Sequence, residues 1–346
     1  MDKKAIALLM NDIHVGKDNI PEFHKNWNEA IDICHKHGIL DIFLGGDLWQ
    51  SRSSQNLDTL LAVREAFKKI ERNGLFLTIA AGNHDCVDQE SVWSYNHIFE
   101  GYQNIELVDD YGVFDVAEQV DLIMMRYYPE NGGFMDHFNN LKDGLAELEG
   151  NKLQILYIHQ GIRGGLGKAT DDELPADIFE DFDNVLVGHY HDRKVIPGTN
   201  IEYIGSSRQH NFGEDEEKGY TILYSDGTYE FIKNEVNTRY KTIEVKAVTN
   251  KLLKELGEIK EDGRYRIKLR ISCKSSDASN IDKSKLLEAG ASKIEFVTEQ
   301  TEIRLSEAQS IDKKFDKHGI KEEYQDFCND RSLDSELGLR YLDKIK

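Results

Sequence analysis

The chain has 346 residues, enough for two domains, and its hydrophobic fraction of 39% is typical of a globular protein. Its four cysteines are widely spaced and form no C-x-x-C pair, which argues against a disulfide framework or a zinc ribbon and fits a reducing compartment. The formal net charge of -20 has the wrong sign for a protein that binds phosphates over its whole surface. Such binding would need a local basic surface, a cation-filled site or a basic partner. No apolar run reaches the length of a signal peptide core or a membrane span, so we expect a cytoplasmic protein with no membrane contact.

Residues 1–236 repeat one pattern, in which a short apolar run is followed by a glycine or polar cluster and then by an amphipathic stretch. The apolar runs predict strands at residues 5–10, 41–44, 75–80, 121–125, 153–158 and 184–187. Helical spacing appears at 24–37 and 56–72. Strands that alternate with helices indicate an α/β layer architecture. From about residue 195 the strands become shorter, and YTILYSDGTYEFI predicts a hairpin with glycine at its turn.

A second unit is expected at 237–300. The sequence predicts helices at 251–260 and 284–290 and strands at 263–273 and 293–299, a small α/β domain. The first of these strands alternates apolar residues with four basic ones, here called the basic face: Arg264, Arg266, Lys268 and Arg270. This face could lie along a DNA backbone, or it could be an ordinary solvated strand face. We predict DNA contact here as a hypothesis.

Residues 301–346 predict two or three short helices with few apolar residues. Because such helices cannot form a core alone, we expect this C-terminal helical segment to pack on a partner or on the rest of the chain.

Groups that can bind metal follow five of the apolar runs. They are Asp12 and His14; Asp47; Asn83, His84 and Asp85; His159; and His189 and His191. In open α/β sheets, ligand sites lie beyond the carboxyl ends of the strands, so these groups can converge. Two histidines spaced H-x-H in extended chain point to the same side, although such a pair alone could also belong to a hydrated loop.

The number of these groups favours two ions rather than one. A single tetrahedral zinc needs four ligands and leaves the rest unused, whereas two ions that share a bridging carboxylate use four histidines, two aspartates and an asparagine. Oxygen and imidazole ligands without thiolate indicate Mn²⁺, Fe or Zn²⁺, and oxygen-rich octahedral sites favour Mn²⁺; Mg²⁺ is a further alternative. Two such ions about 4 Å apart support displacement at phosphorus. Glycines at positions 46, 82 and 188 allow close approach at these strand ends.

The motifs D-x-H, G-D, G-N-H-D, H and G-H-x-H, in this order, resemble the calcineurin-like metallophosphoesterases. Within that superfamily, DIHVGK, GGDLWQSR and IEYIGSSRQHNFGEDEEKGYTIL resemble the SbcD-type nuclease subunit of the double-strand-break repair nuclease–ATPase complexes. The resemblance spans roughly residues 5–240 and extends to a small capping domain. It departs from the family at Gln50, where Asp is frequent, and at Ser207, where Pro is frequent.

The resemblance implies a metallophosphoesterase β-sandwich flanked by helices, with two Mn²⁺ ions per chain. A first ion site would comprise Asp12, His14, Asp47 and His191, and a second ion site Asp47, Asn83, His159 and His189, with Asp47 bridging. His84 would be the general acid, oriented by Asp85. His159 could instead be a strand-end histidine without a ligand role, and His210 is interpreted as an ordinary residue.

The resemblance further implies an exonuclease on duplex DNA ends and an endonuclease on single strands, active in DNA repair and recombination. The expected partners are DNA, an SbcC-type coiled-coil ABC ATPase that docks on 301–346, and a second copy of the chain in a homodimer. The alternatives are a stand-alone phosphodiesterase or phosphatase for a small phosphoester, and a scaffold that has lost catalysis. The complete ligand set argues against the scaffold.

Overall fold

The computed structural model describes residues 3–147, 152–166 and 173–298, with six isolated positions after residue 300. The chain divides into two compact units, Met1–Tyr240 and Lys241–Lys346. The sequence places this boundary after residue 236, close to the division at 240. Among the described residues, no helix combines the length and the hydropathy that a membrane span requires.

The first unit contains two six-stranded sheets. In one the order is β12-β11-β1-β2-β3-β4, with β1 (Ala5–Met10), β2 (Asp41–Leu44), β3 (Phe76–Ala80), β4 (Ile105–Val108), β11 (Gly219–Tyr224) and β12 (Tyr229–Lys233). In the other the order is β5-β6-β7-β8-β10-β9, with β5 (Tyr111–Ala117), β6 (Val120–Met125), β7 (Leu153–His159), β8 (Asn184–Gly188), β9 (Lys194–Val195) and β10 (Ile201–Tyr203).

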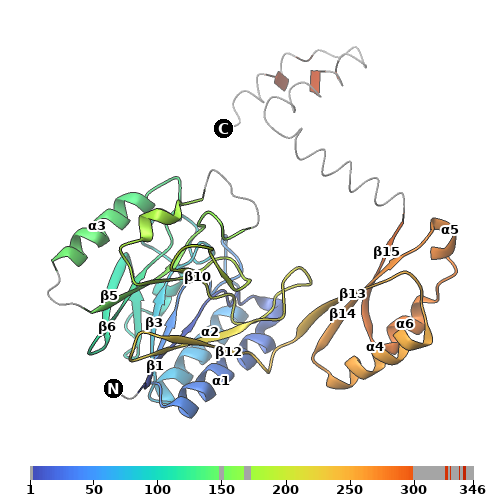
Figure 1. Ribbon diagram of the computed structural model, residues 1–346, viewed down its shortest axis with the longest axis horizontal. Coiled ribbons are helices and arrows are strands. Elements are labelled where there is room, and N and C mark those ends of the chain that lie inside the picture. The colour runs from blue at the N-terminus through green and yellow to red at the C-terminus, as the bar shows by residue number, and fades with distance from the viewer. Residues whose placement is uncertain are drawn as a thin grey trace. The chain divides into compact units, whose positions relative to one another are not determined.

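Alternating apolar residues stack these sheets face to face. Ala7 and Leu9 of β1 pack with Leu122 and Met124 of β6 in a core between the sheets. The intervening residues of β1, such as Leu8, instead pack under α1 (Ile20–His37) and α2 (Leu57–Arg72). The outer face of the second sheet packs under α3 (Phe134–Ala146). Figure 1 shows these helices on the two outer sides of the strands, so the fold is a β-sandwich flanked by helices, as expected.

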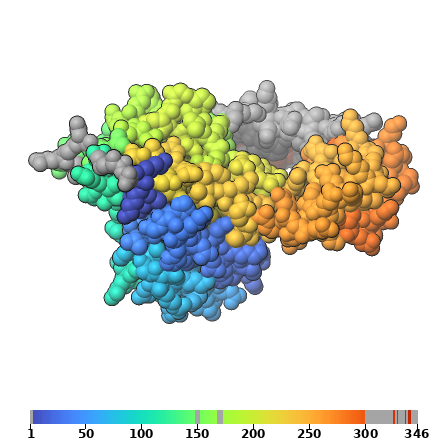
Figure 2. Space-filling view, turned by 60° about the horizontal axis from the view of Figure 1, so that its bottom comes forward, coloured from blue at the N-terminus to red at the C-terminus, as the bar shows by residue number. Residues whose placement is uncertain are grey.

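Both sheets contain parallel strands in register, and this register aligns their carboxyl ends. In the first sheet Met10 pairs with Leu44 and Leu44 with Ile79; in the second, His159 pairs with Gly188. The late strand β11 runs antiparallel to β1, so residues near 220 lie beside the N-terminus. Figure 2 shows this yellow segment against the blue N-terminal one. The loops that follow β1, β2, β3, β7 and β8 can therefore contribute to one site.

The predicted strands all occur, and the structure adds elements that the sequence analysis does not predict. In the first unit these are β4, β5, α3 and the short 3-10 helices η1 (Lys17–Asn19), η2 (Tyr95–Phe99) and η3 (Ala176–Phe179). Strand β5 lies at a sheet edge and is mostly half-buried, so its hydrophobic periodicity is weak.

The second unit contains a three-stranded sheet in the order β13-β14-β15, with β13 (Arg239–Val245), β14 (Tyr265–Ser272) and β15 (Ala291–Val297). Its helices are α4 (Asn250–Asp262), α5 (Ser275–Ala278) and α6 (Lys283–Ala289). Ile267, Leu269 and Ile271 of the central strand are buried against Leu256 of α4 and Leu286 of α6. The basic face therefore belongs to the opposite side of β14. The predicted helical segment 301–346 lies almost wholly outside the described residues.

Two members of the basic face carry acidic partners. Arg270 lies 2.8 Å from the Glu244 carboxylate of β13 and 3.6 Å from that of Glu295 on β15. Arg264 lies 3.0 Å from Asp262. Arg266 is exposed. The positive charge of this face is thus partly balanced within its own sheet.

Candidate metal centre

The seven predicted ligands lie together at the carboxyl ends of five strands. Asp12 and His14 follow β1, Asp47 follows β2, Asn83 follows β3, His159 ends β7, and His189 and His191 follow β8. All are buried or half-buried. The convergence is a consequence of the parallel register, because each strand delivers its next residues to the same edge.

The backbone is strained at the ligands. Among the described residues, only Asp12, His14, Asp47 and His189 have positive φ without being glycine, with values between 48° and 90°. Such a conformation costs of the order of 1–3 kcal/mol for a residue with a side chain, and it persists where the surroundings determine it. All four are predicted ligands, so the fold holds these side chains in place at some cost in local stability.

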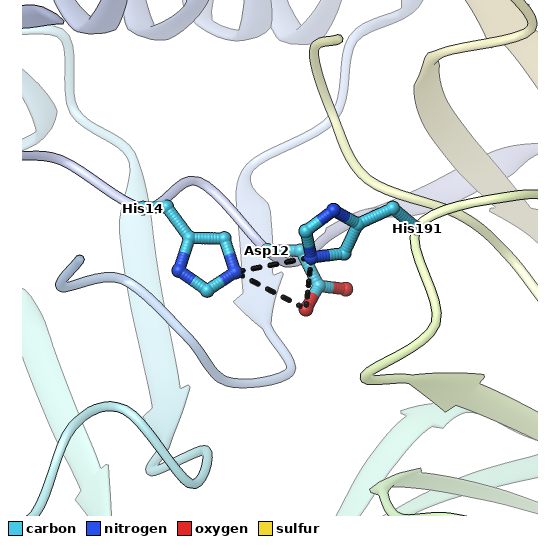
Figure 3. A group of neighbouring side chains, drawn as sticks. All are labelled: Asp12, His14 and His191. Atoms are coloured by element: carbon cyan, nitrogen blue, oxygen red, sulfur yellow. Dashed lines mark hydrogen bonds and ion pairs between the residues drawn. The ribbon is translucent and has the colours of Figure 1, made fainter. Parts of the chain in front are cut away.

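The first ion site has the spacing of a coordination shell. Nε2 of His14 lies 3.2 Å from Nε2 of His191, 3.5 Å from Oδ2 of Asp47 and 3.8 Å from Oδ1 of Asp12. Nε2 of His191 is also 3.8 Å from Oδ1 of Asp12. Figure 3 shows the His14 and His191 rings directing nitrogens toward this carboxylate. Ligands about 2.1 Å from one ion lie roughly 3–3.5 Å apart, so these four atoms can surround a cation.

The second ion site shares Asp47 with the first. Oδ2 of Asp47 lies 3.3 Å from Nε2 of His159 and 3.1 Å from the inward atom of the Asn83 amide. That amide atom, Oδ1 of Asn83, is 3.2 Å from Nδ1 of His189. Because the same Asp47 oxygen faces His14 and His159, it lies where a bridging ligand must be.

Two polar atoms show that this donor set fits cations. Oδ1 of Asp12 is buried and has no hydrogen-bond partner, although three imidazole Nε2 atoms surround it, each 3.8 Å away. The Asn83 oxygen faces only acceptor atoms of His159, His189 and Asp47 unless the amide rotates. Acceptors that converge without a donor repel one another, and a divalent cation at each centre removes that repulsion.

The pKa values fit the same interpretation. Burial lowers the pKa of His14 and that of His189 to about 4, despite nearby carboxylates, so both rings are neutral at pH 7 and can donate a lone pair. Burial also lowers the pKa of His159, but Asp47 and Asp12 outweigh it and raise the value to about 9. A positive charge is therefore stable between these carboxylates, and a metal ion would replace the proton.

Glycine is required at two of the strand ends. A Cβ on Gly46, whose φ is +107°, would lie 2.6 Å from Nδ1 of His159, and one on Gly188 would lie 2.8 Å from the same atom. The ring of His159 is thus seated between two backbones, where Nδ1 is 3.0 Å from the main-chain oxygen of Gly45. This bond directs Nε2 toward the carboxylates.

The structure corrects the predicted role of Asp85. Its buried carboxylate accepts main-chain N–H groups of Gly82 at 2.7 Å, Asp47 at 2.9 Å and Trp49 at 3.0 Å. Nδ1 of His84 instead bonds the main-chain oxygen of Gln50 at 2.9 Å. Asp85 therefore fixes the loop that carries Asp47, and a backbone carbonyl orients His84. Burial and the charge of Asp47 raise the pKa of Asp85 to about 7.

His84 lines the pocket beside both ion sites. Its ring contacts that of His14 edge to face, with centroids 4.7 Å apart. Its main-chain N–H donates to Oδ1 of Asp47 at 2.7 Å, which leaves the other oxygen of that carboxylate for the ions. One of its ring nitrogens also lies within 4.8 Å of ligand atoms of His14 and Asp47. Its ring is thus close enough to act on a group held at the centre.

Segment 206–218 supports the loops that carry the candidate ligands of the first ion site. The sequence analysis does not predict this support. Ser207 donates its main-chain N–H to the main-chain oxygen of Asn11 at 3.1 Å, and the Arg208 guanidinium donates to the main-chain oxygen of Ile13 at 2.9 Å. Nε2 of His210 lies 2.8 Å from the main-chain oxygen of Asp12, so this histidine contacts the loop that carries Asp12 and also lines the pocket. This segment is part of the sequence that resembles the SbcD-type nucleases. Its contacts with the loops of the first ion site are a physical reason for that sequence pattern.

Two further residues of this segment hold His191. The buried Lys218 donates to its main-chain oxygen at 2.7 Å and forms an ion pair with Asp192. The Glu214 carboxylate lies 2.9 Å from its Nδ1. Glu214 and Lys218 both lie in the segment that resembles the SbcD-type nucleases, but their contacts with His191 could not be predicted, because they join positions 23 and more residues apart.

A pocket of about 380 Å³ opens over the centre. Its walls include His84, Gln50, Arg52 and Tyr240. Arg208 also lines it, but this side chain is buried and bonds the main-chain oxygens of Ile13 and His14. Arg52 is exposed and lies beside the Asn83 amide. The pocket thus presents candidate ligands, two further imidazoles (those of His84 and His210) and one exposed guanidinium to a molecule that enters it.

Comparison with known proteins agrees with this geometry. Residues 7–193 match the family described as calcineurin-like phosphoesterase. The protein 078R of Invertebrate iridescent virus 3, named as a phosphoesterase, is 24% identical over 330 residues, covering 91% of this chain and 90% of its own. The DNA double-strand break repair protein Mre11 of Sulfurisphaera tokodaii is 25% identical, over 75% of this chain and 69% of its own. The SbcD protein of the nuclease SbcCD from Staphylococcus epidermidis is 28% identical, over 53% of this chain and 54% of its own.

The matched range contains all seven ligands and His84, so the family assignment and the geometry concern the same residues. The chain belongs to the calcineurin-like phosphoesterase family and is a metal-dependent phosphodiesterase.

Proposed function

We propose that the chain is a Mn²⁺-dependent DNA nuclease, with exonuclease activity on duplex ends and endonuclease activity on single strands. It would be the nuclease component of a DNA repair and recombination complex. The observation that carries this proposal is the similarity to Mre11 and to the SbcD protein of SbcCD, combined with a complete two-site ligand set. Carboxylate, amide and imidazole ligands without thiolate favour Mn²⁺, although Mg²⁺, Fe and Zn²⁺ also bind such sets.

The chain's own residues supply the remaining chemistry. Bound divalent cations provide Lewis acidity and neutralise charge at a phosphoester. His84, whose Nδ1–H can donate to the Gln50 carbonyl, keeps its other nitrogen available to carry a proton to the departing oxygen. Arg52 offers a guanidinium to a phosphate in the pocket, as is common in phosphate recognition. Asp85 contributes by holding the Asp47 loop in place.

DNA binding is proposed to extend to the basic face of the second unit. The alternation of β14 supports this proposal, because Arg266, Lys268 and Arg270 alternate with the residues that are buried against Leu256 and Leu286. The ion pairs of Arg264 and Arg270 reduce the charge that this face can offer to phosphates. We therefore propose a contribution to duplex affinity that is smaller than four full charges.

Two protein partners complete the proposal. Exposed apolar residues on α2 and around η2, among them Leu57 at 67% and Trp93 at 66% exposed, support a homodimer. Light scattering should give twice the chain mass, and Leu61→Glu, on the same helix, should reduce it to one chain. The C-terminal segment 301–346 is proposed to dock on an SbcC-type coiled-coil ABC ATPase. Deletion of this segment should abolish co-purification with that ATPase, and co-purification that survives the deletion contradicts the assignment.

The second candidate is a stand-alone phosphodiesterase or phosphatase for a small phosphoester. It is favoured by the similarity to 078R, which is named as a phosphoesterase and matches over almost the whole chain. The two candidates share the metal centre and differ in substrate.

The test presents three substrates to the protein with Mn²⁺ or Mg²⁺: linear duplex DNA, a single-stranded circle and a chromogenic phosphodiester. A His84→Gln variant and an EDTA-treated sample are the controls for contaminating nucleases. Cleavage of both DNAs that is lost in the controls supports the nuclease. Turnover of the chromogenic ester alone supports the second candidate.

A further inference from the structure

A buried carboxylate lies behind one ligand of the first ion site. Oε1 of Glu214 is 2.9 Å from Nδ1 of His191, and the Glu214 side chain is only 9% exposed. On the opposite edge of the same ring, Nε2 lies 3.2 Å from Nε2 of His14 and 3.8 Å from Oδ1 of Asp12. The ring thus connects the carboxylate to the centre of the first ion site.

This contact has two effects on a metal ligand. An anion at Nδ1 holds the proton on that nitrogen and leaves the lone pair of Nε2 directed at the ion. Its negative charge also makes the imidazole a stronger donor. The contact is built into the loop, because Oε2 of Glu214 accepts the main-chain N–H of His210 at 2.8 Å and Asn211 donates to Oε1 at 2.7 Å.

The second ion site has a different support. There His159 bonds a neutral main-chain oxygen, that of Gly45, at 3.0 Å. A carbonyl fixes the orientation of a ring but brings no net charge. The two ion sites share Asp47. They differ in that a carboxylate, that of Glu214, supports a histidine of the first site, whereas a neutral carbonyl supports His159 of the second.

We propose that Glu214 is a positioning residue that sets the affinity of the first ion site through His191, and that removing its charge weakens this site selectively. The inference rests on the metal part of the proposed function and not on its substrate. Loss of an outer carboxylate of this kind typically lowers metal affinity by about 10–100-fold.

The experiment titrates the metal-free full chain with Mn²⁺ and follows binding by calorimetry and by electron paramagnetic resonance. Two neighbouring Mn²⁺ ions couple magnetically, so the spectrum distinguishes a pair from a single ion without any enzyme assay. The variant is Glu214→Gln, which keeps the shape of the side chain. The matched control is Glu217→Gln, the same change three residues away, where the carboxylate is exposed and pairs with Lys233 at 2.6 Å.

The wild-type protein and Glu217→Gln should both show the coupled pair at two equivalents of Mn²⁺. Glu214→Gln should bind one ion normally and the other about 10–100-fold more weakly, so the single-ion spectrum persists until more Mn²⁺ restores the pair. Its unfolding in EDTA should remain cooperative, with a melting temperature below that of the wild type, because the glutamine amide NH₂ faces one of the donors that Glu214 accepts. Two normal affinities overturn the proposal, as does equal weakening of both ions.

A second measurement needs no variant at Glu214. In Zn²⁺-loaded wild-type protein labelled with ¹⁵N-histidine, Nδ1–H of His191 should give a downfield, slowly exchanging resonance, assigned by its loss in His191→Gln. A rapidly exchanging proton at this nitrogen contradicts the proposal. Because neither readout involves DNA, a protein that binds Mn²⁺ as expected but leaves DNA intact would contradict the nuclease proposal alone.

Discussion

Asp85→Asn separates a structural role of this carboxylate from a role in orienting His84. The carboxylate accepts three main-chain N–H groups, those of Gly82, Asp47 and Trp49, and is fully buried. An asparagine oxygen can take the place of Oδ2, which accepts from Gly82 and Asp47. The amide NH₂ then faces the Trp49 N–H, and neither donor has an acceptor.

The magnitude follows from these two buried donors. Each unsatisfied donor costs about 1–3 kcal/mol, and the loss of the buried charge and of its repulsion with Asp47 offsets part of this. We expect a net destabilisation of about 2–4 kcal/mol, which corresponds to roughly 5–15 °C in melting temperature for a unit of this size. Affinity for both ions should also fall, because the Asp47 loop loses its anchor.

Differential scanning calorimetry and Mn²⁺ titration measure both quantities. The matched control is Asp88→Asn, an exposed aspartate whose Oδ1 accepts only the nearby main-chain N–H of Glu90 among the bonds found in the described part of the chain. It should melt like the wild type. If Asp85→Asn keeps the wild-type melting temperature and Mn²⁺ affinity but loses cleavage, Asp85 acts on His84 after all and the structural account is wrong.

Three further predictions concern catalysis, pH and DNA. His84→Gln should retain both Mn²⁺ ions and cleave DNA about 10²–10⁴-fold more slowly. A substrate with a better leaving group should recover much of the lost rate. Loss of one ion from the variant would instead show that His84 is a ligand. Glu22 has a pKa lowered to about 2, because hydrogen bonds from Lys25, Asn237 and Thr238 outweigh burial. The ionised Glu22 carboxylate therefore stabilises the fold above pH 4.5, and this stabilisation is lost as pH falls toward 2. Glu22→Gln should lower the free energy of unfolding by about 1–2 kcal/mol at pH 7, after allowance for solvent screening, and by little at pH 2. Equal losses at both pH values would refute this prediction. Neutralising the basic face should make the fall of log affinity for duplex DNA with log salt less steep, by less than four full charges would give because Arg264 and Arg270 carry acidic partners; an unchanged slope would return β14 to an ordinary solvated strand.

The convergence of the seven candidate ligands could be predicted because their positions depend on one local rule. Each follows an apolar run, and parallel strands in register deliver the residues after them to one edge. The side chains themselves, with mixed oxygen and imidazole donors, then indicate the metals. The positive φ angles at Asp12, His14, Asp47 and His189 could not be read from the letters, because only a small fraction of Asp and His residues adopt that conformation, although both types are enriched there among non-glycine residues.

The support around the ligands could not be predicted, because it joins distant segments. His191 meets Glu214 across 23 positions, and His84 meets the Gln50 carbonyl across 34. Adjacency in sequence suggested Asp85 as the partner of His84, but main-chain N–H groups from two loops compete successfully for that carboxylate. The helix α3 has Phe134, Phe138 and Leu141 on one face, a helical spacing that is visible in the sequence.

The central claim is that two ions share the Asp47 carboxylate, and metal content after loading tests it most directly. Elemental analysis of EDTA-treated protein reloaded with Mn²⁺ and passed through a desalting column should give two ions per wild-type chain. Asp47→Ala should retain fewer than one, because Oδ2 faces the ligands of both sites. Asp41→Ala, at the start of β2 and outside the pocket, is the matched control and should retain two. Two ions retained by Asp47→Ala, or a single ion in the wild type, would contradict the account.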